Sequence, residues 1–176
     1  MKYLVLCEGT NEVCIINLLL KHNKLKFGID DLVSLKPFNA RQLSNPTIKS
    51  ELRVYNRPVE VLRIGDTQRD KFSIPRDLND IVSKDRIYKY CTLPELEILI
   101  ILNEGLYKQF QKSKESPKTF AKRNIIYNNR RYDQSSDFLE MYYGGKRINM
   151  LTQNLIDYKH LKKHKKDEFY IADLLR

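Results

Sequence analysis

Three acidic residues follow apolar segments in the first half of the chain, where their carboxylates are well placed to do chemistry. Glu8 comes directly after the uncharged residues 3–7, Asp66 follows the strand-like run of residues 59–64, and Asp70 lies four positions further on. Short apolar runs predict strands that are covered on both faces. In an open α/β sheet, ligands bind beyond the carboxyl ends of such strands. We therefore expect Glu8, Asp66 and Asp70 to converge at one edge of a sheet.

The residues after Glu8 predict how its carboxylate is positioned. Gly9 permits a sharp exit from the strand, and Thr10 or Asn11 is a suitable cap for a helix that continues through the apolar residues 13–20. The exposed amides at the start of a helix favour bound phosphate. The simplest structural alternatives are that Glu8 only complements the helix dipole and that Asp66 only forms a turn.

Residues 7–12 (Cys-Glu-Gly-Thr-Asn-Glu) and residues 64–70 (Ile-Gly-Asp-Thr-Gln-Arg-Asp) together resemble the TOPRIM domain of topoisomerases, primases and OLD-type nucleases. The resemblance covers about the first 100 residues, and it is to small stand-alone forms found in mobile elements or phage defence. The family usually has Asp-x-Asp, whereas here Gln68 stands two positions after Asp66. The resemblance implies a Rossmann-like fold, a Mg²⁺ or Mn²⁺ cofactor, and catalytic roles for Glu8, Asp66 and Asp70.

Further acidic residues lie close to the same expected site. Glu12 is on the first helix, and Glu97 follows Pro94 in a Pro-x-x-Glu pattern that is similar to one in some TOPRIM-like proteins. A carboxylate on an otherwise apolar helix needs a partner, a metal or solvent. We therefore add Glu97 and Glu12 to Glu8, Asp66 and Asp70 as metal ligands. Glu95 has a structural interpretation instead, as the last residue of a capping box that begins at Thr92.

The pattern of elements predicts an α/β fold of the Rossmann-like TOPRIM type. Strand-like runs at residues 2–7, 32–35, 59–64 and 86–91 alternate with helical segments, which favours a roughly four-stranded, mainly parallel sheet with helices on its faces. Residues 1–106 would form this core. Residues 107–176, with helices expected at 117–126, 136–143 and 149–164, would form a basic helical appendage packed on the core within a single compact domain.

The charge distribution indicates a polyanionic partner. The net charge is +10, and residues 1–100 hold 16 Lys and Arg against 13 Asp and Glu, whereas residues 101–176 hold 16 against 9. Seven of the eleven tyrosines also lie beyond residue 100, where cations can meet phosphates and rings can stack on bases. The expected nucleic-acid contacts are Arg69, Lys71, Arg130, Arg131, Lys146 and Arg147.

Several classes of function are disfavoured by the composition. The three cysteines are odd in number and lack metal-ligand spacing, which predicts reduced, buried thiols in a cytoplasmic protein. No apolar run approaches the length needed to span a membrane. Neither a GxGxxG nor a GxxxxGK[ST] loop is present, so an ATPase, if one is needed, must be a separate partner chain.

Two functions of different classes remain. The first is a Mg²⁺-dependent nuclease, a phosphodiester hydrolase, or a related phosphoryl-transfer enzyme that acts on DNA or RNA. The second is a non-catalytic nucleic-acid-binding or regulatory module that keeps the fold and the basic surface, as Gln68 would permit. The oligomeric state and the choice between DNA and RNA are not encoded in any motif of the chain.

Overall fold

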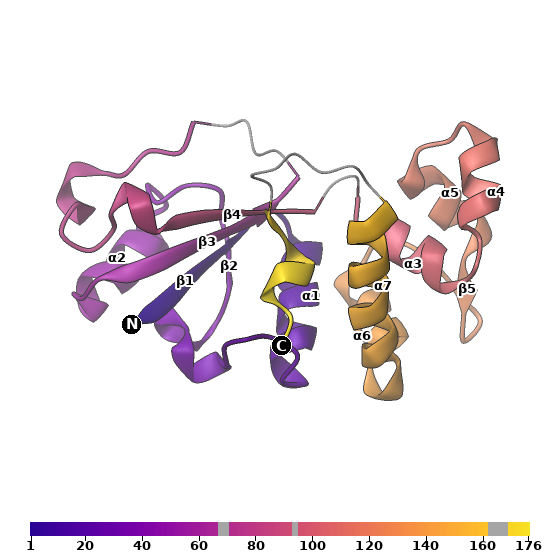
Figure 1. The fold of residues 1–176 in the computed structure, drawn as a ribbon, viewed down its shortest axis with the longest axis horizontal. Helices are drawn as coiled ribbons and strands as arrows, with labels where there is room; N and C mark the ends of the chain where they lie inside the picture. The colour runs from indigo at the N-terminus through magenta and orange to yellow at the C-terminus, as the bar shows by residue number, and fades with distance from the viewer. Residues whose placement is uncertain (67–70, 93–94, 162–168) are drawn as a thin grey trace.

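A five-stranded sheet lies at the centre of the computed structural model, which describes residues 1–66, 71–92, 95–161 and 169–176 (Figure 1). The strand order is β2-β1-β3-β4-β7, and every neighbouring pair is parallel. The strands are β1 (Lys2–Cys7), β2 (Phe38–Asn39), β3 (Val59–Gly65), β4 (Ile87–Cys91) and β7 (Phe169–Tyr170). The predicted α/β class with a mainly parallel sheet is confirmed.

The register of the sheet aligns the ends of its three long strands. Cys7 of β1 lies opposite Ile64 of β3, and Gly65 of β3 lies opposite Cys91 of β4. Most residues of β1 and β3 are buried, as their mainly apolar sequences predict for strands covered on both faces. The residues that follow the three strands therefore meet at one edge of the sheet.

Helices cover both faces of the sheet. One hydrophobic core joins α2 and one face of β1 and β3, and a larger core joins the other face to α1, α3, α5, α6 and α7. Figure 1 shows α1 beneath the sheet and α4 and α5 at the end of the molecule away from α2. The helices are α1 (Thr10–Lys21), α2 (Pro46–Tyr55), α3 (Glu97–Asn103), α4 (Tyr107–Ser113), α5 (Pro117–Asn124), α6 (Ser136–Tyr143) and α7 (Ile148–Leu161).

The strand predicted at residues 32–35 is wrong. Two 3₁₀ turns, Ile29–Asp31 and Val33–Leu35, occupy this region, and Leu32 between them makes only an isolated bridge to Tyr3. Ser34 and Leu35 have φ angles of 57° and 56°. This left-handed backbone interrupts an extended run, so the second strand of the chain forms later, at β2.

The fifth strand comes from the C-terminal segment, where the sequence pattern predicted none. The two residues of β7 pair with Tyr90 and Cys91 of β4 and so extend the sheet beyond the four expected strands. The helices predicted within residues 107–176 correspond to α5, α6 and α7. A small antiparallel hairpin, β5 (Ile126–Tyr127) and β6 (Arg130–Arg131), separates α5 from α6.

The cysteines and the helix lengths agree with two further predictions. Cys7, Cys14 and Cys91 are all buried, as the sequence predicts. Within the described ranges the longest helix, α7, has 14 residues, and no helix there is both long and apolar enough to cross a bilayer.

Candidate functional site: an acidic hollow at the carboxyl edge of the sheet

Glu8 is held at the end of β1 by two polar contacts. One of its carboxylate oxygens, Oε2, accepts a hydrogen bond of 3.0 Å from the backbone N–H of Asp66, and the other, Oε1, lies 2.7 Å from the Arg41 guanidinium. The backbone N–H of Glu8 continues the ladder by donating to the carbonyl of Ile64. Glu8 and Asp66 therefore meet at the sheet edge, as the sequence predicts.

Two glycines make room for these carboxylates. A Cβ placed on Gly65 would lie 2.8 Å from the Cβ of Glu8 and closer still to its Oε2, and a Cβ on Gly9 would lie 2.8 Å from Oε2 of Glu12. Contacts this short do not occur between real Cβ atoms and their neighbours. Gly65 is therefore required for the close approach of β3 to Glu8.

Four carboxylates line one hollow of about 260 Å³ beside this edge. They come from the start of α1, the end of β3 and the start of α3, and the hydroxyl residues Thr10 and Thr92 and the cation Lys118 join them. The four acidic residues are Glu12, Asp66, Glu95 and Glu97. A site at the carboxyl ends of parallel strands is where an open α/β sheet binds its ligands.

The crowding of carboxylates around the hollow shifts the pKa of Glu12. Burial raises the pKa of its carboxyl, and the negative charges of Glu8, Asp66 and Glu97 raise the pKa further. Glu12 lies in the first turn of α1, whose N-cap residue is Gly9 without a side-chain cap bond. The expected capping by Thr10 or Asn11 is therefore wrong, because the helix already begins at Thr10.

Glu97 is the most buried of the four carboxylates, with 6% of the residue exposed. Its Oε1 accepts hydrogen bonds from the Tyr132 hydroxyl at 3.0 Å and from the Gln134 side-chain amide at 3.2 Å. Burial and the charge of Glu97 raise the pKa of Tyr132 far above its usual range, so the hydroxyl remains a donor. The C-terminal segment thus fixes the orientation of this carboxylate.

Glu95 lies next to Lys118, at the start of α5. Burial raises the pKa of Glu95, Glu97 raises it further, and the backbone N–H and the charge of Lys118 oppose this effect. Oε2 of Glu95 is buried without a hydrogen-bond partner in the described part of the chain. The predicted capping role of Glu95 is not observed, because α3 begins at Glu97 with Leu96 at its N-cap and without a side-chain cap bond.

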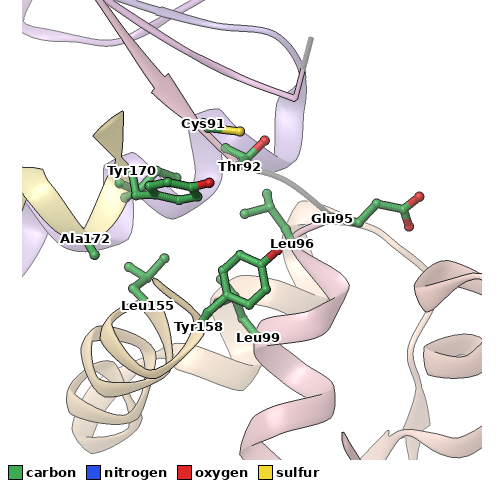
Figure 2. Close-up of a pocket in the computed structure, with 10 residues that line it drawn as sticks. Cys91, Thr92, Glu95, Leu96, Leu99, Leu155, Tyr158, Tyr170 and Ala172 are labelled. Carbon is green, nitrogen blue, oxygen red and sulfur yellow. The ribbon is translucent and has the colours of Figure 1, made fainter. Parts of the chain in front are cut away.

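A smaller pocket lies on the other side of this segment. Figure 2 shows Leu96 and Leu99 directed toward Leu155 and Tyr158, while the Glu95 carboxylate extends away from them. This apolar pocket, between α3, α7 and the end of β4, measures about 20 Å³, the space of about one water molecule. It is too small for a substrate, so the acidic hollow is the better candidate site.

The donor set of the acidic hollow fits a hydrated Mg²⁺ ion. Within residues 1–66, 71–92, 95–161 and 169–176, no three acidic, histidine or cysteine side chains are grouped closely enough to hold a metal ion as they stand. Mg²⁺ usually keeps several waters and is bound by only one or two carboxylates together with substrate phosphates. A cation there would also relieve the repulsion that raises the Glu12 pKa. Asp70, the remaining predicted ligand, lies outside the described residues.

The three arginines predicted to contact nucleic acid in the C-terminal segment have intramolecular partners. Arg130 bonds to Asp133 and Ser135, Arg131 donates to backbone carbonyls of α5, and Arg147 lies over the rings of Tyr127 and Tyr142. These arginines therefore hold the hairpin and α6 in place.

The remaining predicted nucleic-acid contacts are Arg69, Lys71 and Lys146. Lys146 and Lys71 are exposed, and Arg69 is outside the described residues.

Five of the seven tyrosines beyond residue 100 are buried and pack in the interior, so their rings are not presented to bases. They are Tyr132, Tyr142, Tyr143, Tyr158 and Tyr170.

Four residues of the site were not expected from the sequence: Arg41, Lys118, Tyr132 and Gln134. Tyr132 is 35 positions and Gln134 is 37 positions from Glu97, the residue they contact. No spacing or motif links them to the acidic residues, because only tertiary packing brings them together.

Comparison of the chain with protein-family models, with curated proteins and with solved structures finds no match. The assignment of the site therefore rests on its geometry and its chemistry.

Proposed function

We propose that this protein is a Mg²⁺- or Mn²⁺-dependent nuclease, or a related phosphoryl-transfer enzyme of TOPRIM type, and that the acidic hollow is its active site. The observation that carries the proposal is the gathering of Glu12, Asp66, Glu95 and Glu97 around one hollow at the carboxyl ends of parallel strands. Glu8, tied to the backbone of Asp66, lies at the same edge.

The chain's own residues have distinct roles in this proposal. Glu8 and Asp66 would hold the cation, and Glu12 and Glu97 would orient its water ligands. A bound divalent cation polarises a phosphate and lowers the pKa of a bound water. Lys118, the cation among the lining residues, is positioned to contact a phosphate oxygen, and the Arg41 guanidinium is positioned to do so when it leaves Glu8.

The exposed lysines of α4 and α5 are the best surface for the nucleic-acid backbone. Lys118 belongs to this surface and also lines the acidic hollow, so a strand bound along it would lead to the carboxylates. The lysines are Lys108 and Lys112 of α4, Lys114 directly after α4, and Lys118 and Lys122 of α5. Each phosphate that they neutralise adds to the salt dependence of binding.

The decisive experiment separates cleavage from binding. Asp66→Asn and Glu8→Gln should abolish Mg²⁺- or Mn²⁺-dependent cleavage of labelled DNA and RNA while binding is retained. Glu140→Gln is a matched control, because Glu140 is exposed on α6 and does not line the hollow. Replacing Lys108, Lys112 and Lys122 by alanine should weaken binding and reduce its salt slope by about one unit for each phosphate that is no longer neutralised.

A non-catalytic binding module is the second candidate, and two observations favour it. Glu8 is already ion-paired with Arg41, and the described residues contain no ready three-ligand group. This candidate predicts salt-dependent binding of nucleic acid, no cleavage with either metal, and no effect of Asp66→Asn. Cleavage that Asp66→Asn removes would eliminate it.

A further inference from the structure

A second hollow, of about 190 Å³, lies beside β1, β3 and β4, and none of its lining residues lines the acidic hollow. Aromatic side chains from three elements line it: Tyr3 of β1, Tyr88 and Tyr90 of β4, and Phe27 from the loop after α1. The Tyr3 and Phe27 rings pack together with their centroids 4.9 Å apart. This hollow is not part of the proposed active site.

The Glu60 carboxylate lies beside these rings. Tyr3 pairs with Glu60 in the register of β1 and β3, and Leu62, two residues after Glu60, pairs with Tyr88 in the register of β3 and β4. Side chains two residues apart on a strand share a face of the sheet. Glu60 therefore lies beside Tyr3 and diagonally from Tyr88 on one face of the sheet, and all three line the hollow.

Glu60 makes no direct contact with a cation in the described part of the chain. In the ranges of the chain that the structure describes, Glu60 has no ion pair and no hydrogen bond from another side chain. Lys26 and Asp173 line the same hollow: Lys26 donates to the backbone carbonyl of Asp173 at 2.7 Å, and the Asp173 carboxylate forms an ion pair with Lys159. Two carboxylates and one lysine therefore line the hollow, although the whole chain has a net charge of +10.

We infer that this hollow binds a compact organic cation, with an alkylated ammonium group held against the tyrosine rings and beside the Glu60 carboxylate. Aromatic faces attract cations, and cages of aromatic residues recognise quaternary ammonium groups. The volume is below the range of about 300–1,000 Å³ for drug-sized ligands, so the ligand has few heavy atoms.

A nucleobase is a poorer fit to the same rings. A nucleotide would bring its phosphate near Glu60 and Asp31, and both of these carboxylates act electrostatically on Tyr3. Like charges repel at such a site. The proposal is independent of the proposed nuclease activity, because its ligand and its residues are different.

Choline and its neutral isostere 3,3-dimethylbutan-1-ol provide the test, titrated into the full chain by calorimetry or by NMR. Choline should bind with one-to-one stoichiometry and at least about tenfold more tightly than the alcohol. Glu60→Gln and Tyr88→Leu should each weaken choline binding by about tenfold, whereas Tyr88→Phe, which keeps the ring, should bind like the parent. Glu140→Gln, on α6 away from the lining residues, is the matched control and should have no effect.

Three results would overturn the inference. They are equal affinity for choline and the alcohol, unchanged choline affinity in Glu60→Gln, and tighter binding of thymidine 5′-monophosphate than of choline. Melting curves establish that each variant is folded. If Tyr88→Leu does not fold, Glu60→Gln decides the question, since an amide of the same shape replaces a partly exposed carboxylate.

Discussion

Gly65→Ala is the substitution that most directly tests how the sheet edge holds Glu8. The new Cβ would lie 2.8 Å from the Cβ of Glu8 and closer still to its Oε2, so the Glu8 side chain must move. Moving it breaks the bond from the Asp66 N–H to a charged carboxylate. Hydrogen bonds to charged groups contribute about 1.5–3 kcal/mol, and overpacking costs about 1–3 kcal/mol.

Movement of the Glu8 side chain relieves the steric clash with the new Cβ but breaks the hydrogen bond from Asp66. The variant therefore loses stability through either the clash or the lost bond, and the two costs do not add. We expect Gly65→Ala to lower the free energy of unfolding by about 2–3 kcal/mol. For a chain of this length that corresponds to a fall in Tm of about 5–10 °C. Urea denaturation and differential scanning calorimetry measure the two quantities. Gly28→Ala is the control, since its nearest contact would be an ordinary 3.8 Å.

A double-mutant cycle identifies the cause of the loss. In a Glu8→Gly background the side-chain atoms that the new Cβ would meet are gone, so Gly65→Ala should then cost less than about 1 kcal/mol. An equal loss of stability in both backgrounds would refute the reasoning. It would mean that the cost arises from the backbone of β3 and not from its approach to Glu8.

Three further expectations concern the acidic hollow. The folded-state pKa of Glu12 is raised, so its ionised form costs stability above its unfolded pKa, and this cost disappears as the pH falls. Glu12→Gln should therefore be more stable than the parent at about pH 7 in urea denaturation, with the difference shrinking toward about pH 4. Tyr132→Phe removes a hydroxyl donor from Glu97 and should lower the free energy of unfolding by about 1–3 kcal/mol in the same assay. Lys118→Met should raise the pKa of the Glu95 carboxyl in an NMR titration, because the charge of Lys118 lowers that pKa, and an unchanged pKa would contradict the contact.

The sheet edge was predictable because it depends on local patterns. The apolar runs of β1 and β3 identify two strands, and helical segments between them favour parallel pairing, which places Glu8 and Asp66 at the same edge. β7 was not predictable in the same way. Its two residues, Phe169 and Tyr170, follow a lysine-rich segment and are too few to show the alternation of apolar and polar residues that marks a strand. Their place beside β4 is set by long-range packing.

The side chains that contact the acidic residues could not be predicted from the sequence, for a related physical reason. A charged or hydroxyl side chain has the same local pattern whether it faces solvent, a phosphate or an acid from a distant segment. Arg147 was expected to contact phosphate, yet it bonds to Glu104 and lies over two tyrosine rings. Tyr132 was expected on a binding surface, yet its hydroxyl donates to Glu97.

These contacts show that both segments of the chain contribute to the candidate site. The sequence predicts chemistry in residues 1–106 and binding in residues 107–176, but the later segment also builds the acidic hollow, through the Tyr132 and Gln134 bonds to Glu97 and through Lys118. The apolar face of α1 packs against α6 in the larger core. Substitutions in the later segment should therefore act on the geometry of the carboxylates as well as on the proposed binding of nucleic acid. An assay that reads only binding would miss the effect on the carboxylates.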